Sequence, residues 1–128
     1  MSRRNAREIS FKLVFEYMFN RQENNEALEE YIVGLDADDT AYIKETYFGV
    51  CSHYDELVEK ISAHAEGFSA DRIFKVDLAV LLLAVYEINY VSDVPYKVSI
   101  DEAINLAKKY STEKSSKYIN GVLSKFAR

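Results

Sequence analysis

The chain has 128 residues, of which 48% are hydrophobic and 29% are charged, and its formal net charge is −5. This mixture is typical of a soluble globular domain that buries about two-thirds of its unfolded surface. A single cysteine excludes an internal disulfide bond, and the most apolar run, residues 78–86, is far shorter than the ~20 residues of a membrane span. We therefore expect one cytoplasmic domain over residues 1–128, with no targeting peptide and no contact with a membrane.

The charges are distributed unevenly along the chain. Residues 1–12 carry a net charge of +3, residues 108–128 carry +5, and residues 13–107 carry −13. Two basic ends therefore flank an acidic body. This asymmetry is more informative about a partner than the net charge, because it predicts two local sites for an anion.

Helical periodicity covers the first half of the chain. Apolar residues recur every three or four positions from Arg3 to Asn20 and predict a helix. EALEEYIVGL predicts a short helix that ends near Gly34. The segment DADD offers N-cap residues for a long third helix through residues 42–67, and Gly67 is a natural C-terminal stop.

The second half contains the most apolar segment. FSADRIFKVD predicts a tight helical turn, and VDLAVLLLAVYEINYV, residues 76–91, is apolar on nearly every face. A buried strand is an alternative for its core, but sixteen residues without a breaker favour a helix at the centre of a small bundle.

The last two helices have recognisable starting signals. The central helix ends before Pro95, the only proline. Ser99 and Glu102 match a capping box that would begin the next helix, and a final helix is predicted from about Glu113 to Phe126. The fold class is therefore all-α, a compact bundle of about six to seven helices.

Nothing in the sequence indicates catalysis or a metal site. His53 and His64 would lie about 16 Å apart on one helix, too far to share a metal ion. The sequence has no CxxC or HExxH motif, no nucleophile elbow and no glycine-rich phosphate loop after a strand. We expect a protein that is not an enzyme and binds neither metal nor cofactor.

The first basic end is unusual because its arginines open a helix. Cations at a helix N-terminus are disfavoured by ~0.3–1 kcal/mol each, and Arg3 and Arg7 repel each other one turn apart. Local stability therefore does not explain Arg3, Arg4 and Arg7. A frayed, solvated terminus is one interpretation. The other is an anion site, where a phosphate meets free N–H groups and guanidinium groups together.

The second basic end combines lysines with aromatic residues. Lys114 and Lys117 alternate with Tyr118, and residues 108–109 are lysines that precede Tyr110. Lysines bind phosphates and aromatic rings stack on unpaired bases, which suits single-stranded RNA. The alternative is an ordinary helix that solvates its lysines and buries its tyrosines.

Two features depend on how the chain folds. The acidic body would repel RNA unless both basic ends lie on one face.

Gly121 lies in mid-helix, where glycine costs about 1 kcal/mol relative to alanine. We expect a close backbone approach at Gly121, by helix packing more than by ligand contact.

Three stretches resemble the NusB family of bacterial transcription antitermination factors, and the similarity covers essentially the whole chain. RRNARE resembles the arginine-rich opening of that family, and FGV followed later by VDLAVLLLAVYEI resembles its central segment. DVPYKVSIDEAINLAKKYSTEKSSKYINGVLSKF resembles its most specific region, in which VP, V-x-I-[DN]-E-A, LAK and VNGVL recur in order.

The resemblance implies an all-helical fold of two packed helical subdomains. It also implies binding of the single-stranded boxA element of RNA, in ribosomal RNA leaders among others. NusB-like proteins bind boxA together with NusE, a small-subunit ribosomal protein, and the pair helps RNA polymerase to resist termination. Some relatives self-associate, so a homodimer is also an expectation.

The resemblance assigns roles to particular residues. It implies RNA contacts at Arg3, Arg4, Arg7, Lys114, Lys117 and Tyr118, and contacts with the protein partner at Phe15 and Asp77. Leu78 and Leu82 stand where the family often has basic residues. This difference would weaken the phosphate-binding surface, or make that face more apolar for contact with a partner or a second copy.

Two other functions remain open. A protein-interaction module without appreciable RNA affinity is one, and the two leucines favour it. The helical RNA-binding segment of an RNA methyltransferase is a weaker alternative, because the 128 residues include no cofactor-binding domain.

Overall fold

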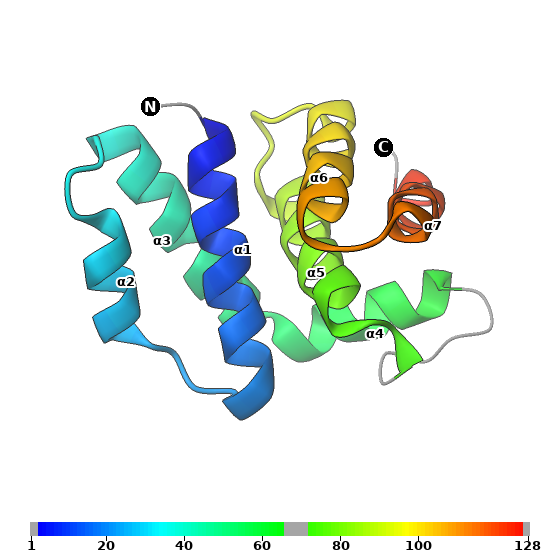
Figure 1. Cartoon of the computed structure of the whole chain (residues 1–128), viewed down its shortest axis with the longest axis horizontal. Helices are drawn as coiled ribbons and strands as arrows, with labels where there is room; N and C mark the ends of the chain where they lie inside the picture. Colours follow the sequence, from blue (N-terminus) through cyan, green and yellow to red (C-terminus); the bar gives the residue numbers. More distant parts are fainter. Residues whose placement is uncertain (1–2, 66–71, 127–128) are drawn as a thin grey trace.

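The computed structural model describes residues 3–65 and 72–126, and these form seven α-helices. The helices are α1 (Arg3–Asn20), α2 (Asn25–Ile32), α3 (Ala37–Ser52), α4 (Tyr54–His64), α5 (Lys75–Tyr90), α6 (Tyr96–Tyr110) and α7 (Glu113–Ser124). Figure 1 shows α1–α3 on one side and α4–α7 on the other. The predicted all-α fold in two packed subdomains is confirmed.

The first subdomain is held by well-capped helices. Asn24 caps α2, since its side chain accepts a hydrogen bond from the backbone N–H of Ala27. Gly34 follows α2 with a φ of +82°, a conformation that favours glycine and ends the helix. Asp36 caps α3 through the N–H of Asp39, as the DADD segment predicts.

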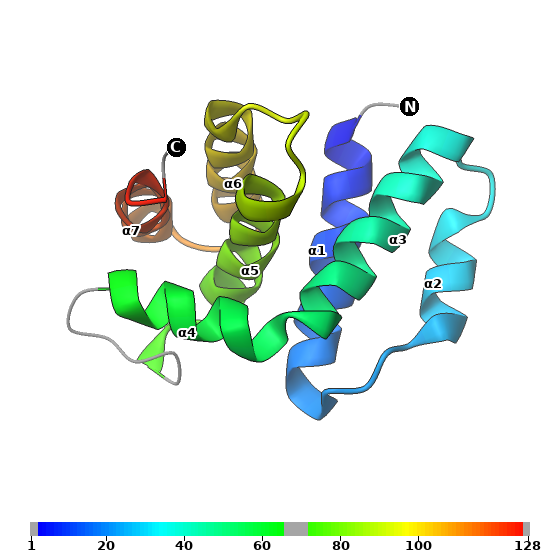
Figure 2. The same ribbon diagram turned by 180° about the vertical axis from the view of Figure 1, so that it is seen from behind.

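The prediction of one long third helix is wrong, because the chain bends at His53 and forms α3 and α4 instead. His53 has a φ of −108° and a ψ of 18°, and its N–H donates to the carbonyl of Gly49 at 3.0 Å. The bend turns α4 across the end of α3, as Figure 2 shows, so that Leu57 and Ile61 pack into the core. The predicted stop at Gly67 lies outside the described residues.

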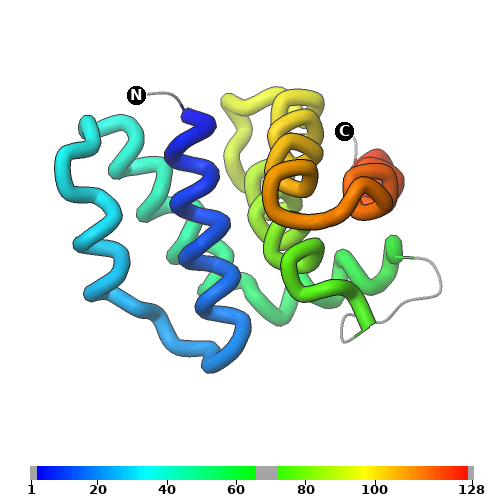
Figure 3. Tube along the Cα trace, in the orientation of Figure 1, coloured from blue at the N-terminus to red at the C-terminus, as the bar shows by residue number. Residues whose placement is uncertain are grey.

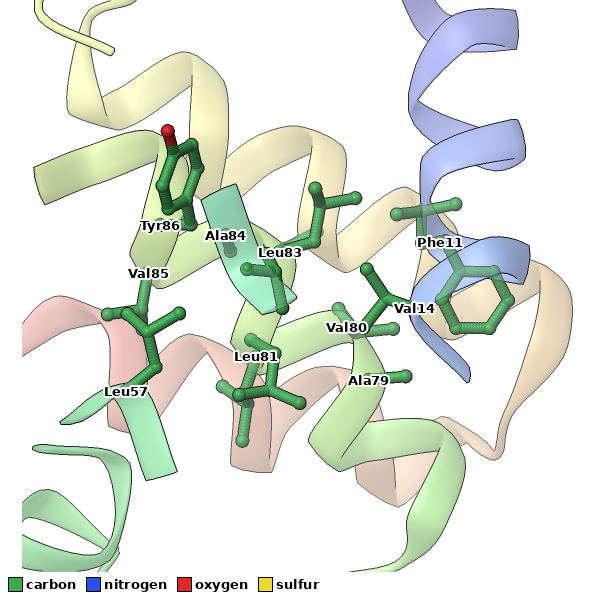
Figure 4. Packing of buried hydrophobic residues seen from close by; sticks show 14 of the residues in the cluster. Phe11, Val14, Leu57, Ala79, Val80, Leu81, Leu83, Ala84, Val85 and Tyr86 are labelled. Atoms are coloured by element: carbon green, nitrogen blue, oxygen red, sulfur yellow. The ribbon is translucent and has the colours of Figure 1, made fainter. Parts of the chain in front are cut away.

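Helix α5 is the centre of the molecule. It is buried along almost its whole length and packs against α1, α3, α4, α6 and α7. Figure 4 shows Val14 of α1 beside Val80 of α5, and Leu57 of α4 beside Val85 of α5. No helix in the described part of the chain is long and apolar enough to cross a membrane.

Two expectations about α5 and α6 are wrong. Leu78 and Leu82 are 3% and 0% exposed, so they pack in the core and form no apolar contact face. Ser99 is not an N-cap, because α6 begins at Tyr96 after Pro95. The hydroxyl of Ser99 instead donates to a carboxylate of α5.

Close backbone packing occurs at a different glycine from the one predicted. A Cβ atom added to Gly121 would meet nothing within 4 Å, so the expected close approach there is wrong. A Cβ atom on Gly49 would lie 2.2 Å from Cζ of Tyr86. Glycine at position 49 therefore allows the ring of Tyr86, on α5, to lie directly against α3.

Candidate nucleic-acid interface

Helices α1 and α6 run side by side in the same direction, and α7 lies on the other side of α6 from α1 (Figures 1 and 3). The charge-bearing first turns of α1 therefore lie against the middle and end of α6. A groove with a volume of about 240 Å³ separates the two helices. It is lined by Arg4, Arg7, Glu8, Glu102, Asn105, Leu106 and Lys109.

Arg4 lies at the rim of this groove and is exposed. Its side chain is 62% accessible, and it forms two hydrogen bonds with Glu102 of α6, Nε to Oε1 at 3.1 Å and Nη2 to Oε2 at 3.0 Å. The hydrogen bond from Arg4 holds the pKa of Glu102 below its usual range. A phosphate can reach the guanidinium group of Arg4 when the hydrogen bonds to Glu102 break.

Arg7 lies in the interior and not on the surface. Only 6% of the residue is exposed, and its Nη2 lies 2.8 Å from Oε1 of Glu87 on α5. Glu87 also accepts hydrogen bonds from the hydroxyls of Tyr42 and Ser99. One carboxylate thus joins α1, α3, α5 and α6. The expected RNA contact of Arg7 conflicts with this burial, since its guanidinium is committed to an internal ion pair.

Arg3 packs on an aromatic ring. Its Cζ lies 4.5 Å from the ring centroid of Tyr42, within the range of a cation–π contact. Each arginine of the first two turns therefore has a partner inside the fold: Arg3 has Tyr42, Arg4 has Glu102 and Arg7 has Glu87. Tertiary contacts within the fold, and not local helix stability, therefore account for these cations.

A second set of contacts joins α1 to the end of α6. Lys109 lies 2.9 Å from both carboxylate oxygens of Glu8, and the hydroxyl of Tyr110 donates to Glu8 at 2.7 Å. The ring of Tyr110 packs against Phe11 with centroids 5.0 Å apart. Tyr110 is therefore partly covered, and only part of its ring is available to stack on a base.

The remaining predicted RNA contacts lie on α7. Lys114 and Lys117 are exposed and Tyr118 is half-buried. Burial raises the pKa of Tyr118, so its hydroxyl stays protonated at neutral pH. Tyr118 also lines a hollow of about 160 Å³ together with Phe74 and Asp77.

The two residues expected to contact a protein partner have different surroundings. Phe15 is half-buried and packs edge-to-face on Phe19, which is 63% exposed, with centroids 5.0 Å apart. Asp77 is only 5% exposed and accepts hydrogen bonds from Ser111 at 2.7 Å and Ser115 at 2.9 Å. Phe15 is thus placed for contact, whereas Asp77 fastens α5 to the α6–α7 junction and conflicts with its expected role.

RNA binding by this acidic protein requires both basic ends to lie on one face. The two basic ends meet, since Arg4 and Lys109 line the same groove. Acidic residues of α2 lie on the far side of α1 from that groove (Figure 1). A polyanion that approaches α1 and α6 therefore meets cations from both basic ends of an otherwise acidic protein.

Comparison with known proteins gives the family. The model of the NusB family matches residues 4–128. The chain belongs to the NusB family. It is 44% identical to the transcription antitermination protein NusB of Natranaerobius thermophilus, over 99% of this chain and 95% of that protein. It is 41% identical to NusB of Bacillus velezensis, over 97% and 94% of the two chains.

Solved NusB structures have the same fold. T. maritima NusB superposes with a TM-score of 0.91 at 36% identity and covers 99% of this chain and 91% of its own. A NusB in complex with NusE and double-stranded RNA has a TM-score of 0.86 at 26% identity, over 97% and 94% of the two chains.

Sequence reasoning missed the acidic residues of this groove. Glu8 and Glu102 bind the cations of the groove, and Glu87 binds the arginine beneath it. A signal existed for Glu87, because a carboxylate within an apolar helix needs a buried partner. No signal paired Arg4 with Glu102, which is 98 residues away.

Proposed function

We propose that this chain is a non-catalytic RNA-binding adaptor in transcription antitermination. It binds single-stranded boxA RNA, of ribosomal RNA leaders among others, together with NusE, and the complex supports processive transcription by RNA polymerase. The observation that carries the proposal is that Arg4 of the first basic end and Lys109 of the second line one groove on the face formed by α1 and α6 of an acidic protein, with the lysines of α7 next along the chain. The solved NusB relative in complex with NusE and RNA adds support.

The proposed RNA contacts follow the exposed groups of that face. Arg4, Lys114 and Lys117 bind phosphates, and Tyr118 stacks on an unpaired base. Tyr110 contributes its uncovered edge. Arg3, whose side chain packs on the ring of Tyr42, adds a further positive charge beside these residues. Arg7 acts indirectly, because its ion pair with Glu87 sets the position of α1 against α5.

The adaptor carries no catalytic group in this account. Burial raises the pKa of the Cys51 thiol to about 12, so the thiol is protonated at neutral pH and is a poor nucleophile. Within the described residues no group of three or more His, Cys, Asp or Glu side chains is arranged to hold a metal ion.

NusE contact is proposed at the apolar part of α1. Phe11, Phe15, Val76 and Tyr110 line a hollow of about 230 Å³ beside the exposed ring of Phe19. This hollow also favours the second candidate function, a protein-interaction module without RNA affinity.

Fluorescence anisotropy separates the two functions. A labelled boxA RNA and a scrambled RNA of equal length are titrated with the protein, with and without NusE, at two salt concentrations. The adaptor prefers boxA, binds more weakly in higher salt and binds more tightly with NusE. Binding of NusE without any preference for boxA would leave the protein-interaction module and reject the RNA sites.

A further inference from the structure

Two carboxylates occupy the groove in the way that phosphates would. Glu102 presents one oxygen to Nε and the other to Nη2 of Arg4, at 3.1 and 3.0 Å. Glu8 lies 2.9 Å from Lys109 through both of its oxygens and accepts the hydroxyl of Tyr110 at 2.7 Å. Such two-oxygen contacts with arginine and lysine are the same contacts that RNA phosphates make.

Both carboxylates are ionised at neutral pH. Hydrogen bonds from Tyr110 and then Lys109 lower the pKa of Glu8, and the hydrogen bond from Arg4 lowers the pKa of Glu102. Ionised acids compete directly with phosphate for the same donors. The groove of the free protein is therefore largely neutralised from within.

We propose that Glu8 and Glu102 hold the RNA groove in a self-neutralised state that limits its affinity, because RNA phosphates must displace them from Lys109, Tyr110 and Arg4. This inference rests on the proposed function. The displacement costs the same free energy for every RNA, so the acids lower the affinity for the preferred sequence and for unrelated RNA by a similar factor.

The geometry allows the exchange without unfolding. Both cations lie at the surface, where ion pairs contribute little to stability and open readily. Asn105 Nδ2 lies 3.4 Å from Oε2 of Glu102, so an amide donor stays beside this carboxylate when the arginine leaves. The buried pair of Arg7 and Glu87 keeps α1 in place during the exchange.

The test uses neutral variants of the two acids and a control of matched chemistry. The variants are Glu8→Gln, Glu102→Gln and the double variant. The control is Glu56→Gln, since Glu56 on α4 also pairs with a lysine, Lys60 at 3.1 Å, and also accepts a tyrosine hydroxyl, that of Tyr90. Helix α4 lies on the opposite face from α6, as Figures 1 and 2 show together.

Anisotropy with boxA and scrambled RNA gives the readout. The double variant is expected to bind scrambled RNA about five- to tenfold more tightly than the control does. Its log–log salt slope should be steeper by about 1.4, because RNA binding to the variant no longer frees two carboxylates that take up cations from solution. Its affinity for boxA should rise by a similar factor. Circular dichroism establishes that each variant is folded.

The outcomes distinguish a failure of the inference about Glu8 and Glu102 from a failure of the proposed RNA-binding function. Salt-dependent RNA binding by wild type, with affinity and slope of the double variant equal to those of the control, would overturn this inference alone. Absence of RNA binding in wild type and all variants would overturn the proposed function as well. If a glutamine variant does not fold, Glu102→Asp replaces it: the shortened carboxylate should loosen its contact with Arg4 and give an intermediate gain, and an unchanged affinity would overturn the inference.

Discussion

Arg7 of α1 and Glu87 of α5 form a buried ion pair, with Nη2 and Oε1 2.8 Å apart, across the boundary between the two subdomains. Burial lowers the pKa of Arg7, but the hydrogen bonds to Glu87 and the nearby charges more than offset that effect, so the pKa is raised. Arg7 is therefore charged at neutral pH. The pair fixes α1, and hence one wall of the groove between α1 and α6, to the central helix.

Removal of this arginine should destabilise the protein strongly. Arg7→Ala leaves the carboxylate of Glu87 buried without its cation, which costs about 3–5 kcal/mol of unfolding free energy. Arg4→Ala is the matched control, because its exposed pair with Glu102 contributes about 1 kcal/mol or less. Urea denaturation measures both. Equal losses in the two variants would contradict the distinction between a structural and a surface arginine.

The same cluster predicts a loss of stability at high pH. Burial raises the pKa of Tyr42 well above its ordinary value of 10.0. A raised pKa means that the folded state keeps a proton that the unfolded state loses, so this contribution is complete below about pH 10 and declines above it. The unfolding free energy of wild type should therefore fall toward that of Tyr42→Phe as pH rises from about 9 to 11. A constant difference between the two proteins would show that Tyr42 ionises equally in both states.

The two helical glycines should respond in opposite directions to alanine. Gly49→Ala places a Cβ atom 2.2 Å from Cζ of Tyr86, so the ring has to move, at a cost of about 1–3 kcal/mol. Gly121→Ala meets nothing within 4 Å and should stabilise α7 by about 0.5–1 kcal/mol. Thermal unfolding measures both changes. Destabilisation by Gly121→Ala would mean that the backbone there is constrained by something other than neighbouring atoms.

Asp77 should behave as a structural residue. Asp77→Ala removes the acceptor of two serine hydroxyls, those of Ser111 and Ser115, and should cost about 1–3 kcal/mol. Binding of NusE and of RNA should then fall together, in proportion to the folded fraction. Asp38→Ala, at an exposed acid of α3, is the control for the lost charge. A selective loss of NusE binding by a fully folded Asp77→Ala protein would restore the direct partner contact.

The sequence predicts the helices better than their junctions. The periodic apolar residues of α1 and the continuous apolar run of α5 place both elements within a few positions. The apolar pattern gives no sign of the bend at His53, because Leu57 and Ile61 would be buried in one straight helix as well as in the bent pair. Residues 99–102 fit a capping box locally, yet Ser99 is drawn inward by the buried Glu87, a tertiary contact that outweighs a local motif.

The site is less predictable for a related reason. Basic residues can be recognised from the residue type alone, so Arg4, Lys114 and Lys117 could be proposed as RNA contacts from the sequence. The acids that neutralise them lie far away along the chain: Glu8 and Lys109 are 101 residues apart. Whether an arginine faces solvent or Glu87 depends on the packing of four helices, which charge patterning alone does not contain.

The salt dependence of RNA binding tests the central claim most directly. Labelled boxA RNA is titrated at several salt concentrations against wild type, the double variant Lys114→Ala and Lys117→Ala on α7, and a control, Lys44→Ala and Lys60→Ala on α3 and α4. If α7 belongs to the RNA-binding face, the log–log slope of the first variant should be shallower than that of wild type by about 1.4, and the control should keep the wild-type slope. Equal slopes in the two variants would contradict the assignment of RNA binding to the face formed by α1, α6 and α7.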